Sequence, residues 1–198
     1  MDLIVKKAKN NNLKRFPLIC LFFFANYSIA EVIEKFEYAS YKAVANPNQP
    51  LYESLNKASP IRENGKVFHG YTEWNIIWQY QFSEENTGEC KITKITTNIQ
   101  TVITLPTLAG GSAKQQNRFL KYYTALKEHE LGHYYYGKTA ATEIDRQLAR
   151  LPRMVNCKAL ETSANNLGNQ IIDHYKKKDS QYDVTTSHGK TQGAYLED

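Results

Sequence analysis

The sequence predicts an α+β fold, because two segments with the composition of strands come before two long segments with the periodicity of helices. Residues 67–82 and 90–105 are rich in Trp, Tyr, Ile, Val and Thr. The turn-forming residues 83–88 lie between them, so an antiparallel hairpin is expected. Apolar residues recur at helical spacing after Ser112 and again over residues 156–178. We expect these helices to form an antiparallel pair packed on the hairpin sheet.

Shorter elements are expected before the hairpin. Residues 32–44 alternate irregularly in polarity and predict a strand, which the polar and proline-containing segment 46–50 ends. Residues 51–58 predict a short helix that stops before Pro60. In the second hairpin strand, the Leu105-Pro106 pair predicts the end of the strand.

Local signals also set the expected limits of the long helices. Ser112 is a good N-cap, Gln115 would complete a capping box with it, and no proline follows until Pro152. The tail over residues 179–198 is polar and without periodicity, so its composition predicts an irregular segment.

The first thirty residues predict a signal peptide. A basic region is followed by the apolar run 16–24 and by Ser28-Ile29-Ala30, which favours cleavage after Ala30. The apolar run is about half of the roughly 20 residues that a membrane-spanning helix needs. We therefore expect residues 31–198 to form one exported domain, periplasmic or secreted, without a membrane span. An uncleaved N-terminal anchor is the alternative.

The composition of the mature chain excludes some partners and predicts a cross-link. Residues 31–198 carry 20 basic and 19 acidic side chains, and this near-neutral balance does not predict a nucleic-acid-binding protein. Cys90 and Cys157 are the two cysteines left after cleavage, and an oxidising compartment favours a disulfide between them. Two buried free thiols are the alternative.

The segment His129-Glu130-Leu131-Gly132-His133 carries the predicted chemistry. Residues four apart on a helix differ by about 40° around the axis, so both imidazoles can reach one ion. Imidazole nitrogen is a preferred zinc ligand, and zinc lowers the pKa of a bound water toward about 7. Glu130 is placed to act as the general base on that water. The motif predicts a hydrolase with one zinc ion per chain and a zincin-like arrangement; a metal-free polar helix face is the alternative.

A catalytic zinc site needs a third protein ligand. Tyr136 and Thr139 stand where a metzincin would have glycine and histidine, which excludes that subclass. Glu161 on the second helix is a candidate, as in gluzincin-type sites, and a solvated helix charge is its alternative. We expect His69 to be a hydrogen-bonded structural histidine and His174 to lie on the surface.

Several strings of residues give the chain a family resemblance. They are Gly70-Tyr71-Thr72-Glu73-Trp74, Cys90, Leu105-Pro106, the histidine motif, Cys157 and the segment 182–194. With these the chain resembles, over nearly all of its mature length, a bacterial family called domain of unknown function 922. Its members are described as predicted secreted zinc-dependent proteases.

The resemblance implies that the tail is part of the site. His188 is then the preferred third zinc ligand, with Glu161 as the alternative. Asp183 is a candidate acceptor for an imidazole N–H of a ligand, and Tyr182 a candidate donor to a tetrahedral oxyanion. A turn carboxylate and a packed aromatic ring are the alternatives for these two.

The sequence thus predicts an exported zinc peptidase that hydrolyses a peptide bond in an unidentified peptide or protein. Two alternatives remain. The first is a non-catalytic binding protein of the cell envelope, in which the helix site is structural or empty. The second is a metal-dependent amidase that acts on cell-wall material, because the water-activating chemistry would be the same.

Overall fold

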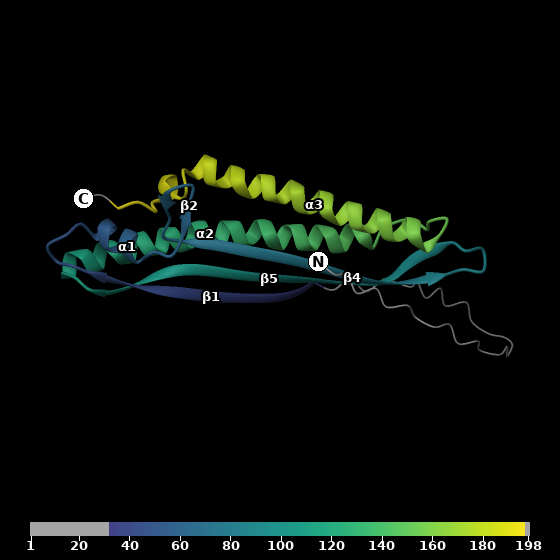
Figure 1. Ribbon diagram of the computed structural model, residues 1–198, viewed down its shortest axis with the longest axis horizontal. Coiled ribbons are helices and arrows are strands. Elements are labelled where there is room, and N and C mark those ends of the chain that lie inside the picture. The colour runs from purple at the N-terminus through teal and green to yellow at the C-terminus, as the bar shows by residue number, and fades with distance from the viewer. Residues whose placement is uncertain (1–31, 197–198) are drawn as a thin grey trace, which may run out of the picture. The chain divides into compact units, whose positions relative to one another are not determined.

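The computed structural model describes residues 32–196, so the predicted signal peptide lies outside the described residues. This part of the chain is a mixed α+β protein whose sheet is mainly antiparallel (Figure 1). Its three α-helices are α1 (Leu51–Ala58), α2 (Ala113–Leu148) and α3 (Cys157–Thr186). None of the helices in this range has the length and apolarity needed to cross a membrane.

The main sheet has three strands in the order β1-β5-β4, where β1 is Val32–Ala45, β4 is Tyr71–Glu84 and β5 is Cys90–Gly110. The predicted strand, short helix and hairpin are confirmed. The predicted end of the second hairpin strand at Leu105-Pro106 is wrong, because β5 continues to Gly110. Both side chains are buried, and a proline removes one ladder hydrogen bond without preventing an extended chain.

The start of α2 is the predicted capping box. The backbone N–H of Gln115 donates to Ser112 Oγ at 3.3 Å, and the N–H of Ser112 donates to Gln115 Oε1 at 2.8 Å. The side-chain amide of Gln115 also donates to the carbonyls of Asn46 and Gln49. This one side chain therefore ties the helix start to the segment between β1 and α1.

The C-terminal segment differs from its prediction. Helix α3 begins after the N-cap Asn156, whose Oδ1 accepts from the N–H of Ala159, and it runs to Thr186. A short 3₁₀ helix, Lys190–Gln192, follows. The prediction of an irregular segment is wrong here, because the polar side chains of this last helical stretch contact polar side chains of α2, which composition cannot show.

A small hairpin that was not predicted is made by β2 (Arg62–Glu63) and β3 (Lys66–Val67). Asn64 and Gly65 both have positive φ, at 50° and 78°. This is the Asn-Gly pair of a two-residue hairpin turn, and it was the signal that could have predicted the element.

The described residues group into two compact units. One comprises Ile77–Asn98 and Ala141–Ile171 with the first residues of β1, and the other comprises Glu34–Ile76, Ile99–Ala140 and the chain from Ile172 onward. In the first unit the ring of Trp78 is almost fully buried and lies where a side chain at Gly168 would be. The second unit has an apolar core around Leu55, Ile103, Leu105, Phe119 and Leu126.

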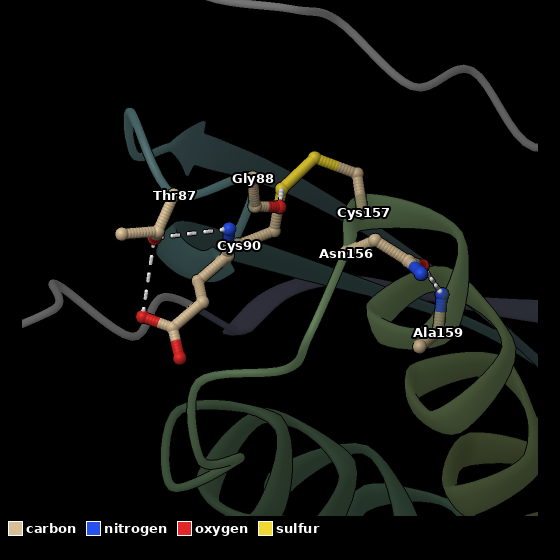
Figure 2. The surroundings of a disulfide bond; sticks show 7 residues. Thr87, Gly88, Cys90, Asn156, Cys157 and Ala159 are labelled. Carbon is tan, nitrogen blue, oxygen red and sulfur yellow. Dashed lines mark hydrogen bonds between the residues drawn. A yellow bond between two sulfur atoms is a disulfide. The ribbon is translucent and has the colours of Figure 1, made fainter.

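The predicted disulfide is present in the first unit. Cys90 at the start of β5 is bonded to Cys157 at the start of α3 (Figure 2). Beside it, Cys90 and Met154 exchange two backbone hydrogen bonds of 2.9 Å. The cross-link therefore joins the first turn of α3 to the hairpin.

Removing this disulfide should lower the free energy of unfolding. The cysteines are 67 residues apart, and the chain-entropy account gives about 4 kcal/mol for a loop of that length. We expect a Cys90→Ser, Cys157→Ser protein to unfold at a lower urea concentration than the oxidised wild type and together with the reduced wild type. Coinciding urea midpoints for the oxidised wild type and the double variant would contradict this.

Candidate metal centre

The two histidines of the motif lie one turn apart on α2, as the sequence predicted. Both are buried, with exposed fractions of 2% for His129 and 7% for His133. Their Nε2 atoms face each other at 3.2 Å. Two buried imidazole nitrogens are therefore presented to one point in space.

Helix α3 brings a carboxylate to the same point. Asp183 Oδ1 lies 3.1 Å from His129 Nε2 and 3.2 Å from His133 Nε2. Among residues 32–196, these three side chains form the group whose ligand atoms could hold a metal ion. Ligand atoms about 2.0–2.1 Å from a tetrahedral zinc are roughly 3.4 Å apart. The observed triangle is close to that size, and two imidazoles with one carboxylate are a donor set that zinc accepts.

The other nitrogen of each imidazole has a partner of its own. His133 Nδ1 lies 2.7 Å from Asp179 Oδ1, and His129 Nδ1 lies 2.9 Å from Gln192 Oε1. Both partners are acceptors, so each can hold the proton of a neutral imidazole on Nδ1, which would leave Nε2 for a metal ion at the shared point. Neither Asp179 nor Gln192 was predicted to contact the site. The spacing of four residues between Asp179 and Asp183, which equals that between the two histidines, is the one sequence signal that could have predicted Asp179.

The electrostatics of this cluster favour a cation. Burial lowers the pKa of His133, but hydrogen bonds and charge from Asp179 and Asp183 outweigh burial and raise it to about 10. Burial alone would raise the pKa of Asp183, but hydrogen bonds from His129 and His133 hold it well below its usual range. The two carboxylates thus stabilise positive charge between the helices.

Glu130 lies next to this cluster and is 4% exposed. Thr72 Oγ1 donates to its Oε2 at 2.7 Å. Burial raises the pKa of the Glu130 carboxyl, while the Thr72 hydrogen bond opposes the shift. A β-carbon added at Gly70 would come within 2.4 Å of Glu130 Oε1. The segment before β4 therefore confines the carboxylate from one side.

His188, the preferred third ligand from the sequence, stands just outside the group of three. Its Nδ1 is 3.2 Å from Asp183 Oδ1, and its ring centroid is 4.9 Å from that of Phe68. Its side chain is half-exposed. Ser187 and His188 both have positive φ, near 50°, and the His188 N–H donates to the Asp183 carbonyl at 2.8 Å. This turn directs the chain back toward α2, and the role of His188 as a ligand stays a prediction.

The other predicted residues lie as follows. Glu161 is in the first unit, where it pairs with Lys158 at 3.4 Å. The Tyr182 ring stacks on His129 with centroids 5.0 Å apart and lies where a side chain at Gly132 would be. Its hydroxyl accepts from Gln192 Nε2 at 2.9 Å. The proposed contact of this hydroxyl with an oxyanion stays a prediction.

A cleft of about 1650 Å³ opens beside the cluster. It lies in the second unit and is bounded by α1, the β2–β3 hairpin, α2 and the C-terminal segment. His129, Glu130, His133, Asp183 and His188 all line it. The three residues that could hold a metal ion and the buried glutamate thus line the same cleft.

His69 also lines this cleft and is hydrogen-bonded, as predicted. Its Nε2–H donates to Asn56 Oδ1 at 2.8 Å, and its Nδ1 accepts from the Tyr122 hydroxyl at 2.7 Å. The Tyr41 hydroxyl donates to the His69 carbonyl at 2.9 Å. These bonds fix the segment that leads to Gly70.

The site and fold define a mixed α+β protein with a histidine-histidine-aspartate cluster that could hold a metal ion. Residues 38–189 match the family described as bacterial protein of unknown function, DUF922, and the chain belongs to it. No curated protein and no solved structure matches the chain. The predicted family is therefore confirmed, and no named relative supplies an activity.

The burial of His69 should make the fold less stable in acid. Burial lowers its pKa from 6.5 to about 4, so the unfolded chain takes up a proton first as the pH falls. Neutral His69 therefore makes its full contribution to the free energy of unfolding above pH 6.5. This contribution, at most about 3 kcal/mol, is lost as the pH falls toward 4. We expect histidine NMR to show this ring titrating below pH 5. Titration near pH 6.5 would contradict the burial argument.

Proposed function

We propose that the chain is an exported zinc-dependent peptidase in which His129 and His133 hold one zinc ion. The observation that supports this best is the convergence of their Nε2 atoms and Asp183 Oδ1 within 3.2 Å, beside the buried carboxylate of Glu130. A solvated helix surface does not bury its histidines in this way. A zincin-like arrangement, as expected from the motif, is part of the proposal.

Asp183 is our proposal for the third ligand. Its Oδ1 already completes the triangle of ligand atoms, and its pKa is held low, so it is ionised and ready to bind a cation. From the sequence, His188 was the preferred third ligand and Glu161 the alternative. His188 is near enough to contact Asp183, whereas Glu161 lies in the other unit and pairs with a lysine.

Bound zinc would supply a water of lowered pKa and an electrophile for the substrate carbonyl. The chain's own residues would do the rest. Glu130 would take the proton of the water and pass it to the leaving amine, because burial raises its pKa toward the value that suits a proton carrier. Thr72 would hold one carboxylate oxygen and leave the other free to meet the water. Asp183 and His188 would face the substrate side of the cleft.

The substrate class follows from the cleft. Its volume of about 1650 Å³ exceeds that needed for a single amino acid and suits a chain of several residues. An amide of cell-wall material is the second candidate substrate, because the same cluster would cleave it. Export is supported by the disulfide, which is typical of oxidising compartments.

The role of Glu130 is tested by Glu130→Gln, which keeps the shape of the side chain and removes the base. We expect zinc to remain bound and the rate of peptide hydrolysis to fall by about 100-fold or more. Glu128→Gln is the matched control, since Glu128 is exposed two residues away on the same helix. Hydrolysis by Glu130→Gln at the rate of the control would refute the proposed mechanism.

The third ligand is tested by the zinc content of Asp183→Ala and His188→Ala, measured by mass spectrometry of the native proteins. We expect the wild type to hold one zinc per chain, Asp183→Ala to lose most of it and His188→Ala to keep it. Loss of zinc from His188→Ala but not from Asp183→Ala would show that His188, and not Asp183, is the third ligand. A folded wild type that binds no zinc when offered the metal would favour the non-catalytic binding protein instead.

A further inference from the structure

Asp179 connects three elements of the second unit through its carboxylate. Its Oδ1 accepts from His133 Nδ1 at 2.7 Å, and its Oδ2 accepts from Trp74 Nε1 at 3.1 Å. The side chain is about four-fifths buried. The hydrogen bonds therefore run from Trp74 in β4 through Asp179 in α3 to His133 in α2.

Trp74 is itself held in place. Its ring occupies the space above Gly137 of α2, where an added β-carbon would come within 2.6 Å of the indole. Glycine in a helix interior is unfavourable by about 1 kcal/mol relative to alanine. Here the missing side chain lets the indole approach α2 closely and point its N–H at the Asp179 carboxylate.

We propose that Asp179, held by Trp74, is a positioning residue of the metal centre. The inference rests on the proposed zinc site. A neutral imidazole has one N–H, and an ionised carboxylate can only accept. Asp179 therefore keeps the proton of His133 on Nδ1 and leaves the lone pair of Nε2 for the metal.

The hydrogen bonds that the two histidines make through Nδ1 differ in strength. His129 Nδ1 faces the neutral amide oxygen of Gln192 at 2.9 Å, whereas His133 Nδ1 faces a carboxylate at 2.7 Å. Hydrogen bonds to charged groups are stronger than those between neutral groups. The orientation and basicity of His133 should accordingly depend on Asp179 more than those of His129 depend on Gln192.

Two substitutions test this directly through zinc affinity. Asp179→Asn places one acceptor and one NH₂ group before two facing donors, so one of the two hydrogen bonds is lost. We expect its dissociation constant for zinc, measured by competition with a chromophoric chelator, to rise by about 10- to 100-fold. Trp74→Phe keeps an aromatic ring but removes the indole N–H and part of the ring, and it should raise the dissociation constant for zinc by a smaller factor.

The chain offers a matched control for each substitution. Trp78 lies four residues further along β4, and its Nε1 donates to Asn165 Oδ1 at 3.4 Å in the first unit, not to the metal cluster. Trp78→Phe therefore removes an indole N–H without touching this chain of hydrogen bonds. Asp173→Asn makes the same charge change as Asp179→Asn at an exposed position of α3. We expect both controls to bind zinc as tightly as the wild type.

A second readout separates positioning from a general loss of structure. In the zinc-loaded wild type, ¹⁵N histidine NMR should show His133 protonated at Nδ1. Zinc binding by Asp179→Asn at wild-type affinity would overturn the inference. If Asp179→Asn does not fold, the test rests on Trp74→Phe. Equal zinc affinities of Trp74→Phe and Trp78→Phe would then overturn the inference. A folded wild type that binds no zinc would instead count against the proposed function.

Discussion

The candidate site depends on two pairs of side chains that meet across two helices. His129 and His133 are one turn apart on α2, and Asp183 and Asp179 are one turn apart on α3, in the opposite chain direction. Buried imidazoles and carboxylates are costly unless they are paired, and here each group satisfies the others. The four residues thus hold this stretch of α3 against α2 and also create the place where a cation is favoured.

Small residues make this approach possible. Gly132 lies under the Tyr182 ring, Gly137 lies under Trp74, and Gly70 faces the Glu130 carboxylate. Two of these glycines are inside α2, where they lower the intrinsic stability of the helix. The three glycines leave room for Tyr182, Trp74 and Glu130 near the histidines. Close packing therefore builds the cluster together with the hydrogen bonds.

The polar C-terminal segment is a structural part of the site. Helix α3 continues to Thr186, and the three residues of positive φ that follow, 187–189, turn the chain back toward α2. The turn returns Gln192 to His129 and buries Ala194 in the apolar core. The segment completes the outer hydrogen bonds of the histidines and one wall of the cleft.

The sequence by itself determined the local features: the α+β class, the capping box at Ser112, the disulfide partners, and a helix carrying two histidines and a glutamate. Each follows from neighbouring residues or, for the cysteines, from simple counting. The tertiary structure decided which carboxylates meet the histidines, because residues 179–186 have no apolar period, and their helical state depends on contacts with α2. It also decided that β5 continues through Pro106, where burial of the side chains outweighs the lost N–H. Asp179, Asp183 and Gln192 are 46 to 63 residues from the histidines they contact, and only packing brings such distant polar side chains to one point.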